Sequence, residues 1–250
     1  MREADADRIQ AVLERASLRG AGFPVGSGGI ASRIDHTLLR PEATREEILR
    51  LCDEGLLHGF AAVCIHPVRV GAAVERLRGS AVKVAAVAGF PLGASLTQVK
   101  ALEVSRALDE GAVEIDMVQN VGLLKDGEDD LVRRELEAIA AICAREGAIL
   151  KIILETALLS DEEKVRAAWI ARDAGADFVK TSTGFGPGGA TVRDVTILRE
   201  AVGPGMGVKA SGGIRSLAEA RAMLGAGATR LGTSSGVRMV GEEMAEDLGG

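Results

Sequence analysis

Lysine occupies unusual positions in this chain of 250 residues. Only seven of its 30 Lys and Arg residues are lysine, yet four of the seven interrupt short apolar runs of β-strand length: Lys83, Lys151, Lys180 and Lys209. A buried charge is costly unless it is paired. Lysine, unlike arginine, can lose its proton and become a nucleophile. These four lysines are therefore candidates for Schiff-base chemistry, with a structural ion pair as the alternative for each.

The position of each lysine within its run separates the candidates. Lys180 and Lys209 lie close to where an apolar run gives way to a Gly-rich segment, whereas Lys83 is near the start of its run and Lys151 is in the middle. A free lysine, with a pKa of about 10.4, is charged at pH 7, but partial burial beside a second cation favours the neutral amine. We therefore predict Lys180 as the nucleophile, Lys209 as the second cation, and Lys151 as a member of a core ion pair.

A proton carrier is also needed, and Asp116 is the candidate. It interrupts the apolar run Val113–Val118 near its end, where an unpaired carboxylate would be costly. We predict that it moves protons at the site of the amine. The alternative is that Asp116 only pairs with a structural lysine.

Three of the apolar runs continue into segments rich in glycine and hydroxyl side chains: Thr181–Gly189, Ser211–Ile214 and Gly232–Gly236. Backbone N–H groups of such segments can form an anion-binding nest. Any one of them could be an ordinary turn. Together, on neighbouring strands, they predict recognition of a phosphate group.

The elements that would position these residues follow a repeating pattern. Eight short apolar runs alternate with segments of helical spacing, which is typical of a parallel sheet covered on both sides. The runs are Ile30–Thr37, Phe60–Ile65, Val82–Ala88, Val113–Val118, Ile149–Glu155, Asp177–Thr181, Gly207–Ala210 and Thr229–Gly232. The clearest helical segments are Thr44–His58, Leu96–Glu110, Glu128–Arg145 and Asp161–Ala174. Eight such units favour a closed (β/α)8 TIM barrel, with an open doubly wound sheet as the alternative.

The domain organisation expected is one barrel with short extensions. Residues 1–29 are predicted to form a helix over 4–19 and a Gly-rich linker over 20–29, residues 30–240 the barrel, and residues 241–250 a polar tail. Gly111, Gly175 and Gly227 each lie between a helical segment and the next apolar run, and are predicted to end helices with positive φ.

Composition excludes several classes of protein. The net charge of −6 does not favour nucleic acid or an anionic membrane surface as a partner. Three widely spaced cysteines, the lack of an apolar leader and the lack of a membrane-length apolar run predict a reduced, cytoplasmic protein. No cluster has metal-ligand spacing, so neither a metal nor another cofactor is expected.

Seven stretches, in this order over about residues 30–238, resemble the 2-deoxyribose-5-phosphate aldolase family. They are Ile34–Leu38 (IDHTL), Ala62–Ile65 (AVCI), Gly89–Gly93 (GFPLG), Glu114–Val118 (EIDMV), Lys151–Thr156 (KIILET), Phe178–Gly186 (FVKTSTGFG) and Val208–Arg215 (VKASGGIR). The resemblance implies a cofactor-free class I aldolase. It would reversibly cleave 2-deoxy-D-ribose 5-phosphate to D-glyceraldehyde 3-phosphate and acetaldehyde, in the catabolism of deoxyribonucleotides.

The resemblance also implies roles for particular residues. Lys180 would form the Schiff base, and Asp116 and Lys209 would be the proton-handling pair. The phosphate-binding positions would be Gly184, Gly212, Gly213, Ser234 and Ser235. Asp35, Thr37 and Thr183 would lie near the substrate. Cys64 ends a strand on the expected active-site face, although a small buried residue is the simpler interpretation.

One family feature is missing, and two other functions remain open. The family often has a C-terminal tyrosine that is proposed to aid proton transfer, but this chain has no tyrosine. The alternatives are a Schiff-base lyase acting on another short aldehyde or keto acid, and a non-catalytic barrel that binds a phosphorylated ligand. Barrels of this kind usually pair through their outer helices, so a homodimer or homotetramer is expected.

Overall fold

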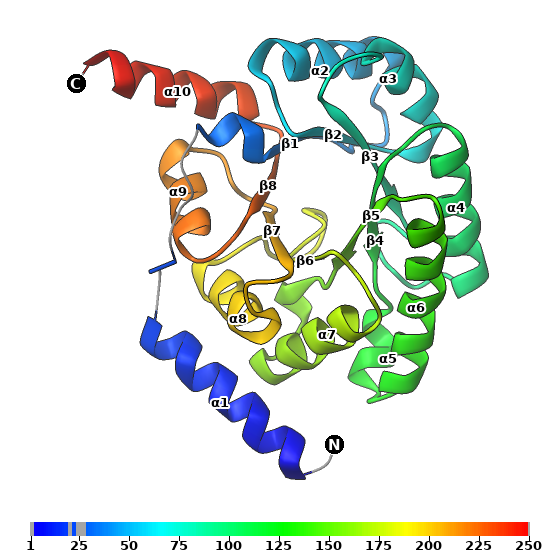
Figure 1. The fold of residues 1–250 in the computed structure, drawn as a ribbon, viewed down its shortest axis with the longest axis vertical. Helices are drawn as coiled ribbons and strands as arrows, with labels where there is room; N and C mark the ends of the chain where they lie inside the picture. The colour runs from blue at the N-terminus through cyan, green and yellow to red at the C-terminus, as the bar shows by residue number, and fades with distance from the viewer. Residues whose placement is uncertain (1–2, 20–21, 24–28, 250) are drawn as a thin grey trace.

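Eight parallel strands close into a barrel in the order of the chain, as the computed structural model shows for residues 3–19, 22–23 and 29–249 (Figure 1). The strands are β1 (Ile34–Leu38), β2 (Ala62–Ile65), β3 (Lys83–Ala88), β4 (Glu114–Val118), β5 (Ile149–Ile153), β6 (Phe178–Lys180), β7 (Gly207–Ser211) and β8 (Arg230–Thr233). Strand β8 pairs with β1 and completes the ring. The predicted (β/α)8 barrel is therefore confirmed, and an open sheet is excluded.

Helices surround the barrel, and all but α1, before β1, and α10, after β8, connect successive strands. They are α1 (Glu3–Arg19), α2 (Arg45–His58), α3 (Val70–Arg76), α4 (Thr97–Asp109), α5 (Val121–Lys125), α6 (Asp129–Arg145), α7 (Asp161–Asp173), α8 (Val192–Val202), α9 (Leu217–Gly225) and α10 (Gly236–Gly249). Short 3-10 turns lie at Ile30–Arg33, Pro67–Arg69 and Thr156–Leu158. In the described part of the chain, no helix is long and apolar enough to cross a membrane.

Three of these helices begin at the same sequence signal. In each, a Ser or Thr side chain accepts a hydrogen bond from the backbone N–H three residues later, and a Glu at that position bonds back to the first residue. This reciprocal pair satisfies two N–H groups that the helix itself leaves free. The pairs are Thr44 with Glu47, Ser160 with Glu163, and Ser216 with Glu219.

The main core lies between the strands and the helices, whereas the inside of the barrel is divided. Strand residues that face outward, such as Val63, Ile115 and Leu231, are fully buried against the helices. Part of the barrel interior is a separate cluster of small apolar side chains on β2 and β3, including Cys64 and Ala85. The other strands point charged side chains inward, so the space inside the barrel is a polar site beside an apolar wall.

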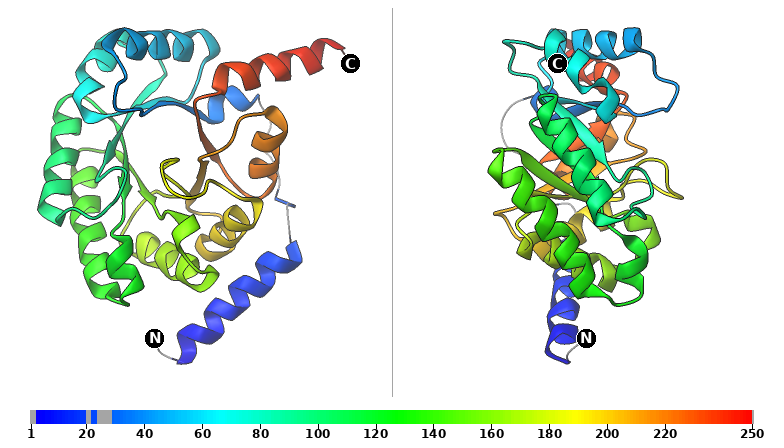
Figure 2. Two further views of the ribbon diagram at one scale, coloured as in Figure 1. Left: turned by 180° about the vertical axis from the view of Figure 1, so that it is seen from behind. Right: turned by 90° about the vertical axis from the view of Figure 1, so that its right-hand side faces the viewer.

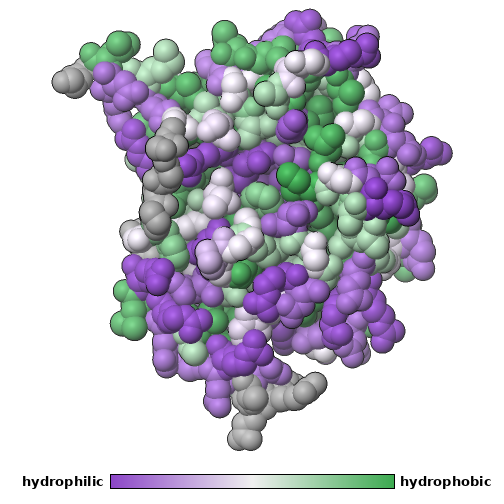
Figure 3. Space-filling view, in the orientation of Figure 1, coloured by the Kyte–Doolittle hydropathy of each residue, from purple (hydrophilic) through white to green (hydrophobic). Residues whose placement is uncertain are grey.

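The extensions at the two ends of the chain pack along the outside of the barrel. Helix α1 lies beside α8 and α7 in both Figure 1 and Figure 2, and it buries Ile9 and Val12 there. The predicted linker over residues 20–29 lies for the most part outside the described residues. Residues 241–249, predicted as a polar tail, instead continue helix α10. In the view of Figure 3, hydrophilic and hydrophobic residues are mixed over the surface.

Candidate active site

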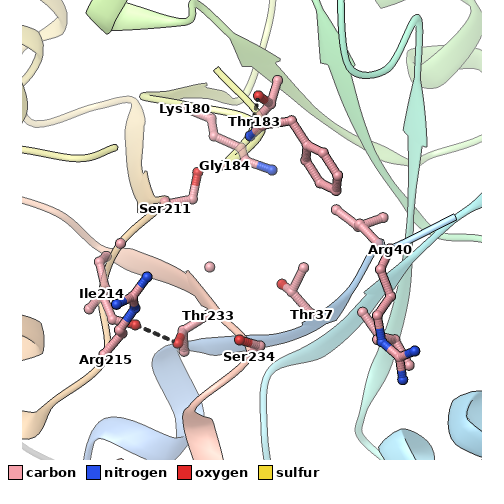
Figure 4. Close-up of a pocket in the computed structure, with 16 residues that line it drawn as sticks. Thr37, Arg40, Lys180, Thr183, Gly184, Ser211, Ile214, Arg215, Thr233 and Ser234 are labelled. Atoms are coloured by element: carbon pink, nitrogen blue, oxygen red, sulfur yellow. Dashed lines mark hydrogen bonds between the residues drawn. The ribbon is translucent and has the colours of Figure 1, made fainter. Parts of the chain in front are cut away.

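A cavity of about 360 Å³ opens where the strands end, and it contains most of the predicted site (Figure 4). Side chains from β1, β6, β7 and β8 and from the loops after them surround it. Seven residues predicted from the sequence line it: Lys180, Thr37, Thr183, Gly184, Gly212, Gly213 and Ser234. Active sites of (β/α)8 barrels lie at this end of the strands, so the cavity is the candidate active site.

Lys180 is the amine that the cavity exposes. It is the last residue of β6, it is 3% exposed, and its Nζ lies 2.7 Å from Oδ2 of Asp116. Lys209 is its register partner on β7, and Lys209 Nζ also lies 2.7 Å from Asp116 Oδ2. The two amines predicted to be neighbours therefore share one carboxylate oxygen, which lies below the floor of the cavity.

Beneath Lys180, six charged side chains of alternating sign form a closed circuit, which we call the charge ring. Going round it, the members are Asp116, Lys151, Glu114, Arg230, Asp35 and Lys209. The distances between charged atoms are 2.8 Å for Asp116–Lys151, 2.6 Å for Lys151–Glu114, 2.8 Å for Glu114–Arg230 and 2.5 Å for Arg230–Asp35. Lys209 closes the ring by contacting Asp35 and Asp116. Lys180 is attached to the ring through Asp116 and is not part of it.

The ring holds two of its carboxylates, those of Asp116 and Asp35, ionised. Burial raises the pKa of Asp116, but the surrounding ammonium groups, with Lys151 foremost, hold it well below its usual range. Burial likewise raises the pKa of Asp35, yet the nearby cations, with Lys209 foremost, lower it to about 2. Conversely, burial lowers the pKa of Lys209, while Asp116 and Asp35 raise it above its usual value. Asp116, Asp35 and Lys209 therefore keep their charges at neutral pH.

Space for Lys209 is created by a glycine on the next strand. A Cβ added at Gly232 would lie 3.1 Å from Cε of Lys209 and 2.9 Å from Cβ of Ser211. Cys64 lies on the apolar side of the same space, with Sγ 3.8 Å from Asp116 Oδ2. It is fully buried and does not line the cavity, and burial raises the pKa of its thiol.

The glycine-rich loops after β6 and β7 touch each other backbone to backbone. A Cβ at Gly189 would lie 2.2 Å from the carbonyl oxygen of Gly212, and the amide of Ala190 donates to that same oxygen. The hydroxyl of Ser211 donates to the carbonyl of Ser182 and joins the loops a second time. Ser235, predicted to bind phosphate, lies outside the cavity lining, directly before the first residue of α10. The predicted anion nest is thus a pair of interlocked loops beside the start of a helix.

Several residues of the site were not predicted as site residues. Arg40 and Arg215 line the cavity, and the guanidinium of Arg40 is paired with Glu42 and Glu47. Phe185 lines the cavity and meets Phe90 edge to face, with ring centroids 5.4 Å apart. Glu114 and Arg230, each the first residue of its strand, are likewise not predicted as site residues from the sequence. A lone charge at the start of an apolar run is indistinguishable from an exposed strand end until the barrel is closed.

Within the described residues, no group of three or more His, Cys, Asp or Glu side chains could hold a metal ion. A bound molecule would meet the amine of Lys180, the carboxylate that Lys180 shares with Lys209, and the two glycine-rich loops after β6 and β7.

Comparisons with known proteins agree with this geometry. Residues 30–239 match the model of the DeoC/LacD family of aldolases. A deoxyribose-phosphate aldolase of Thermococcus gammatolerans is 56% identical over 213 residues, which are 84% of this chain and 95% of that protein. The one of Caldanaerobacter subterraneus is 54% identical over 221 residues, 88% of this chain and 96% of that protein.

Solved structures show the same barrel. The structure described as a unique tetrameric deoxyribose phosphate aldolase from Aeropyrum pernix superposes with a TM-score of 0.81 at 37% sequence identity. The superposition covers 95% of this chain and 98% of that chain. From its sequence, its fold and the residues gathered in its cavity, this chain belongs to the DeoC/LacD family of aldolases.

Proposed function

We propose that this aldolase reversibly cleaves 2-deoxy-D-ribose 5-phosphate to D-glyceraldehyde 3-phosphate and acetaldehyde through a Schiff base on Lys180. The observation that carries the proposal is the placement of a single amine, Lys180 Nζ, at the floor of the cavity and on the carboxylate that Lys209 also contacts. The names of the relatives support the substrate.

The charge ring supports a neutral amine at this position. Its three cations and three anions balance, so Lys180 is the one uncompensated cation of the cluster when it is protonated. Buried charges are stable only when they are paired. Loss of the proton from Lys180 leaves the cluster neutral and produces the nucleophile that Schiff-base formation requires.

The reaction then follows from the groups present. The amine of Lys180 attacks C1 of the open-chain aldehyde, and loss of water gives an iminium ion. The iminium accepts the electron pair of the C2–C3 bond as that bond breaks, while the C3 hydroxyl loses its proton and becomes the aldehyde of glyceraldehyde 3-phosphate. Protonation of the enamine at C2 and hydrolysis release acetaldehyde and restore Lys180.

Proton transfers in this scheme use Asp116 and Lys209. Both are fully buried and share one oxygen–nitrogen contact below Lys180, so we propose that they act through a water molecule in the cavity. Among the described residues, none after Ser234 lines the cavity, so the C-terminal segment contributes no group to its wall. The interlocked loops, Arg215 and the start of α10 would hold the phosphate and orient the sugar.

Borohydride trapping tests this function. The protein is incubated with deoxyribose 5-phosphate, reduced, digested and analysed by mass spectrometry. We expect one adduct, on the peptide that contains Lys180, together with acetaldehyde among the products. Lys180→Leu should abolish the adduct and turnover, whereas Lys83→Gln, at the exposed start of β3, should leave both unchanged.

Other outcomes distinguish the alternatives. Trapping at Lys180 without release of acetaldehyde would indicate a lyase with another substrate. Saturable binding without trapping, retained in Lys180→Leu, would indicate a binding protein. The Aeropyrum pernix relative is described as tetrameric, which supports the expectation of a homo-oligomer. Light scattering on the purified protein tests that part of the proposal.

A further inference from the structure

Arg230 closes the charge ring from the side opposite Lys180. Its guanidinium contacts both oxygens of Glu114, at 2.8 and 2.9 Å, and Oδ1 of Asp35, at 2.5 Å. It is the first residue of β8, and Glu114 is the first residue of β4. Its side chain is 14% exposed, and no contact joins it to Lys180. Any effect of Arg230 on the amine must therefore pass through the ring.

We infer that Arg230 and Glu114 are positioning residues that set the pH at which Lys180 becomes reactive, an inference that rests on the proposed role of Lys180 as the nucleophile. With the ring balanced at three cations and three anions, the proton on Lys180 is the single excess charge. Removing a cation from the ring leaves an anion that the proton on Lys180 can compensate. Removing an anion makes that proton harder to hold.

The groups that face Lys180 come from every neighbouring strand. They are Asp116 on β4, Lys209 on β7 and Cys64 on β2, with Lys151 on β5 acting through Asp116. Arg40 and Arg215 line the same cavity, and Glu155, which follows β5, is bonded to Thr183. The ion pairs of the ring lie within the barrel, where water screens charges weakly. Removing one charge from the ring therefore changes the electrostatic potential at Lys180, even when the substituted residue does not contact it.

The sign of the effect gives a sharp test. Arg230→Gln should move the pH midpoint of Lys180 reactivity upward, and Glu114→Gln should move it downward, each by on the order of one pH unit. The double variant Arg230→Gln/Glu114→Gln should return it close to the wild-type value. Arg230→Lys keeps the positive charge, so the pH midpoint of Lys180 reactivity in this variant should equal that of the wild type.

Reactivity is measured without the sugar substrate, so that this inference and the proposed function can fail separately. The protein is labelled with acetic anhydride across a pH series, and acetylation of the Lys180 peptide is compared with that of Lys125, whose side chain is 46% exposed. Lys83→Gln is the matched control, because it also removes a cation from the first residue of a strand but lies outside the ring. Urea unfolding of each variant confirms the fold.

The results decide as follows. Opposite shifts for the two single variants, cancelling in the double variant, support the inference. Shifts in the same direction, or shifts no larger than that of Lys83→Gln, overturn it. If Arg230→Gln does not fold, the downward shift of Glu114→Gln and the wild-type midpoint of Arg230→Lys are required instead, and the absence of either overturns the inference. If the sugar substrate gives no adduct on Lys180 but the shifts are seen, the proposed function is contradicted and the inference about Arg230 and Glu114 is not.

Discussion

The carboxylate of Glu155 accepts hydrogen bonds from both the amide and the hydroxyl of Thr183, at 3.3 and 2.5 Å. Glu155 follows β5 with φ 57° and ψ 63°, a left-handed conformation that costs a residue with a side chain on the order of 1–3 kcal/mol. It is 4% exposed. The loop after β6 is thus held from the neighbouring strand by a residue that is itself strained.

Removing that carboxylate should loosen the loop without affecting the nucleophile. We expect Glu155→Ala to raise KM for the phosphorylated substrate roughly tenfold or more, because a hydrogen bond to a charged group contributes about 1.5–3 kcal/mol. Steady-state kinetics measures KM, and trapping with acetaldehyde should still label Lys180. Glu155→Gln, which retains an acceptor oxygen, should give an intermediate KM. An unchanged KM in Glu155→Ala would show that Thr183 is held by other contacts.

The contact between the two glycine-rich loops predicts a steric effect at Gly189. A Cβ there would lie 2.2 Å from the backbone oxygen of Gly212, so Gly189→Ala must push the loops apart. Overpacking of this kind costs about 1–3 kcal/mol, and we expect KM to rise roughly tenfold. Gly205→Ala is the control, because a Cβ at that position meets nothing within 4 Å. Equal KM values for the two variants would contradict the proposed phosphate site.

Acid should destabilise the barrel through the ring carboxylates. In the folded protein the pKa of Asp35 is about 2, below its ordinary value of 3.8. A depressed pKa contributes stability that is complete above the unfolded value and is lost as the pH falls through the folded one. We therefore expect about 2 kcal/mol of unfolding free energy from this group to disappear between pH 4 and 2.

Urea unfolding at a series of pH values measures this loss. Asp35→Asn has no carboxyl group to titrate at this position, so its unfolding free energy should depend less steeply on pH in the same window. Glu146→Gln, a surface acid paired only with its neighbour Arg145, should keep the wild-type slope. Parallel curves for wild type and Asp35→Asn would show that the ring does not govern acid stability.

Helix α1 is predicted to stabilise the barrel and to have no effect on catalysis. Ile9 and Val12 are buried against the outer helices, and the guanidinium of Arg8 lies 4.7 Å from the ring centre of Trp169. Burial of one such aliphatic side chain contributes about 1.5–3 kcal/mol. Deletion of residues 1–19 should lower the unfolding free energy by several kcal/mol, measured in urea, with kcat/KM unchanged. A fall in kcat/KM at full stability would give the helix a catalytic role instead.

The barrel could be predicted because its signals are local and repeated. Each of the eight predicted strands overlaps an observed one, and Gly111, Gly175 and Gly227 have the predicted positive φ, at 98°, 89° and 106°. Errors lie at the ends of elements, where Ile30–Arg33 forms a 3-10 turn before β1. Helix α8, most of whose residues are buried, polar ones included, is not among the clearest helical segments predicted from the sequence.

The centre of the site was predictable only in part. Lys180 and Lys209 stood out because lysine is rare in this chain and both lie near the ends of adjacent strands. That Asp116 would contact three lysines at once, and that Arg230 would reach Glu114 across the barrel, depends on the closure of β8 onto β1. Such contacts are set by three-dimensional geometry and leave no trace in local spacing.

The charge ring also constrains how this barrel can evolve. Every member has at least two partners of opposite sign, so a neutral substitution at one position leaves its buried partners short of a counter-charge, and breaking a buried pair typically costs about 3–5 kcal/mol. A substitution that removes one charge of the ring therefore requires a second substitution that restores the charge balance. New substrate preferences are therefore accessible first through the rim, at positions such as Phe185, Arg40 and Arg215, while the interior stays fixed.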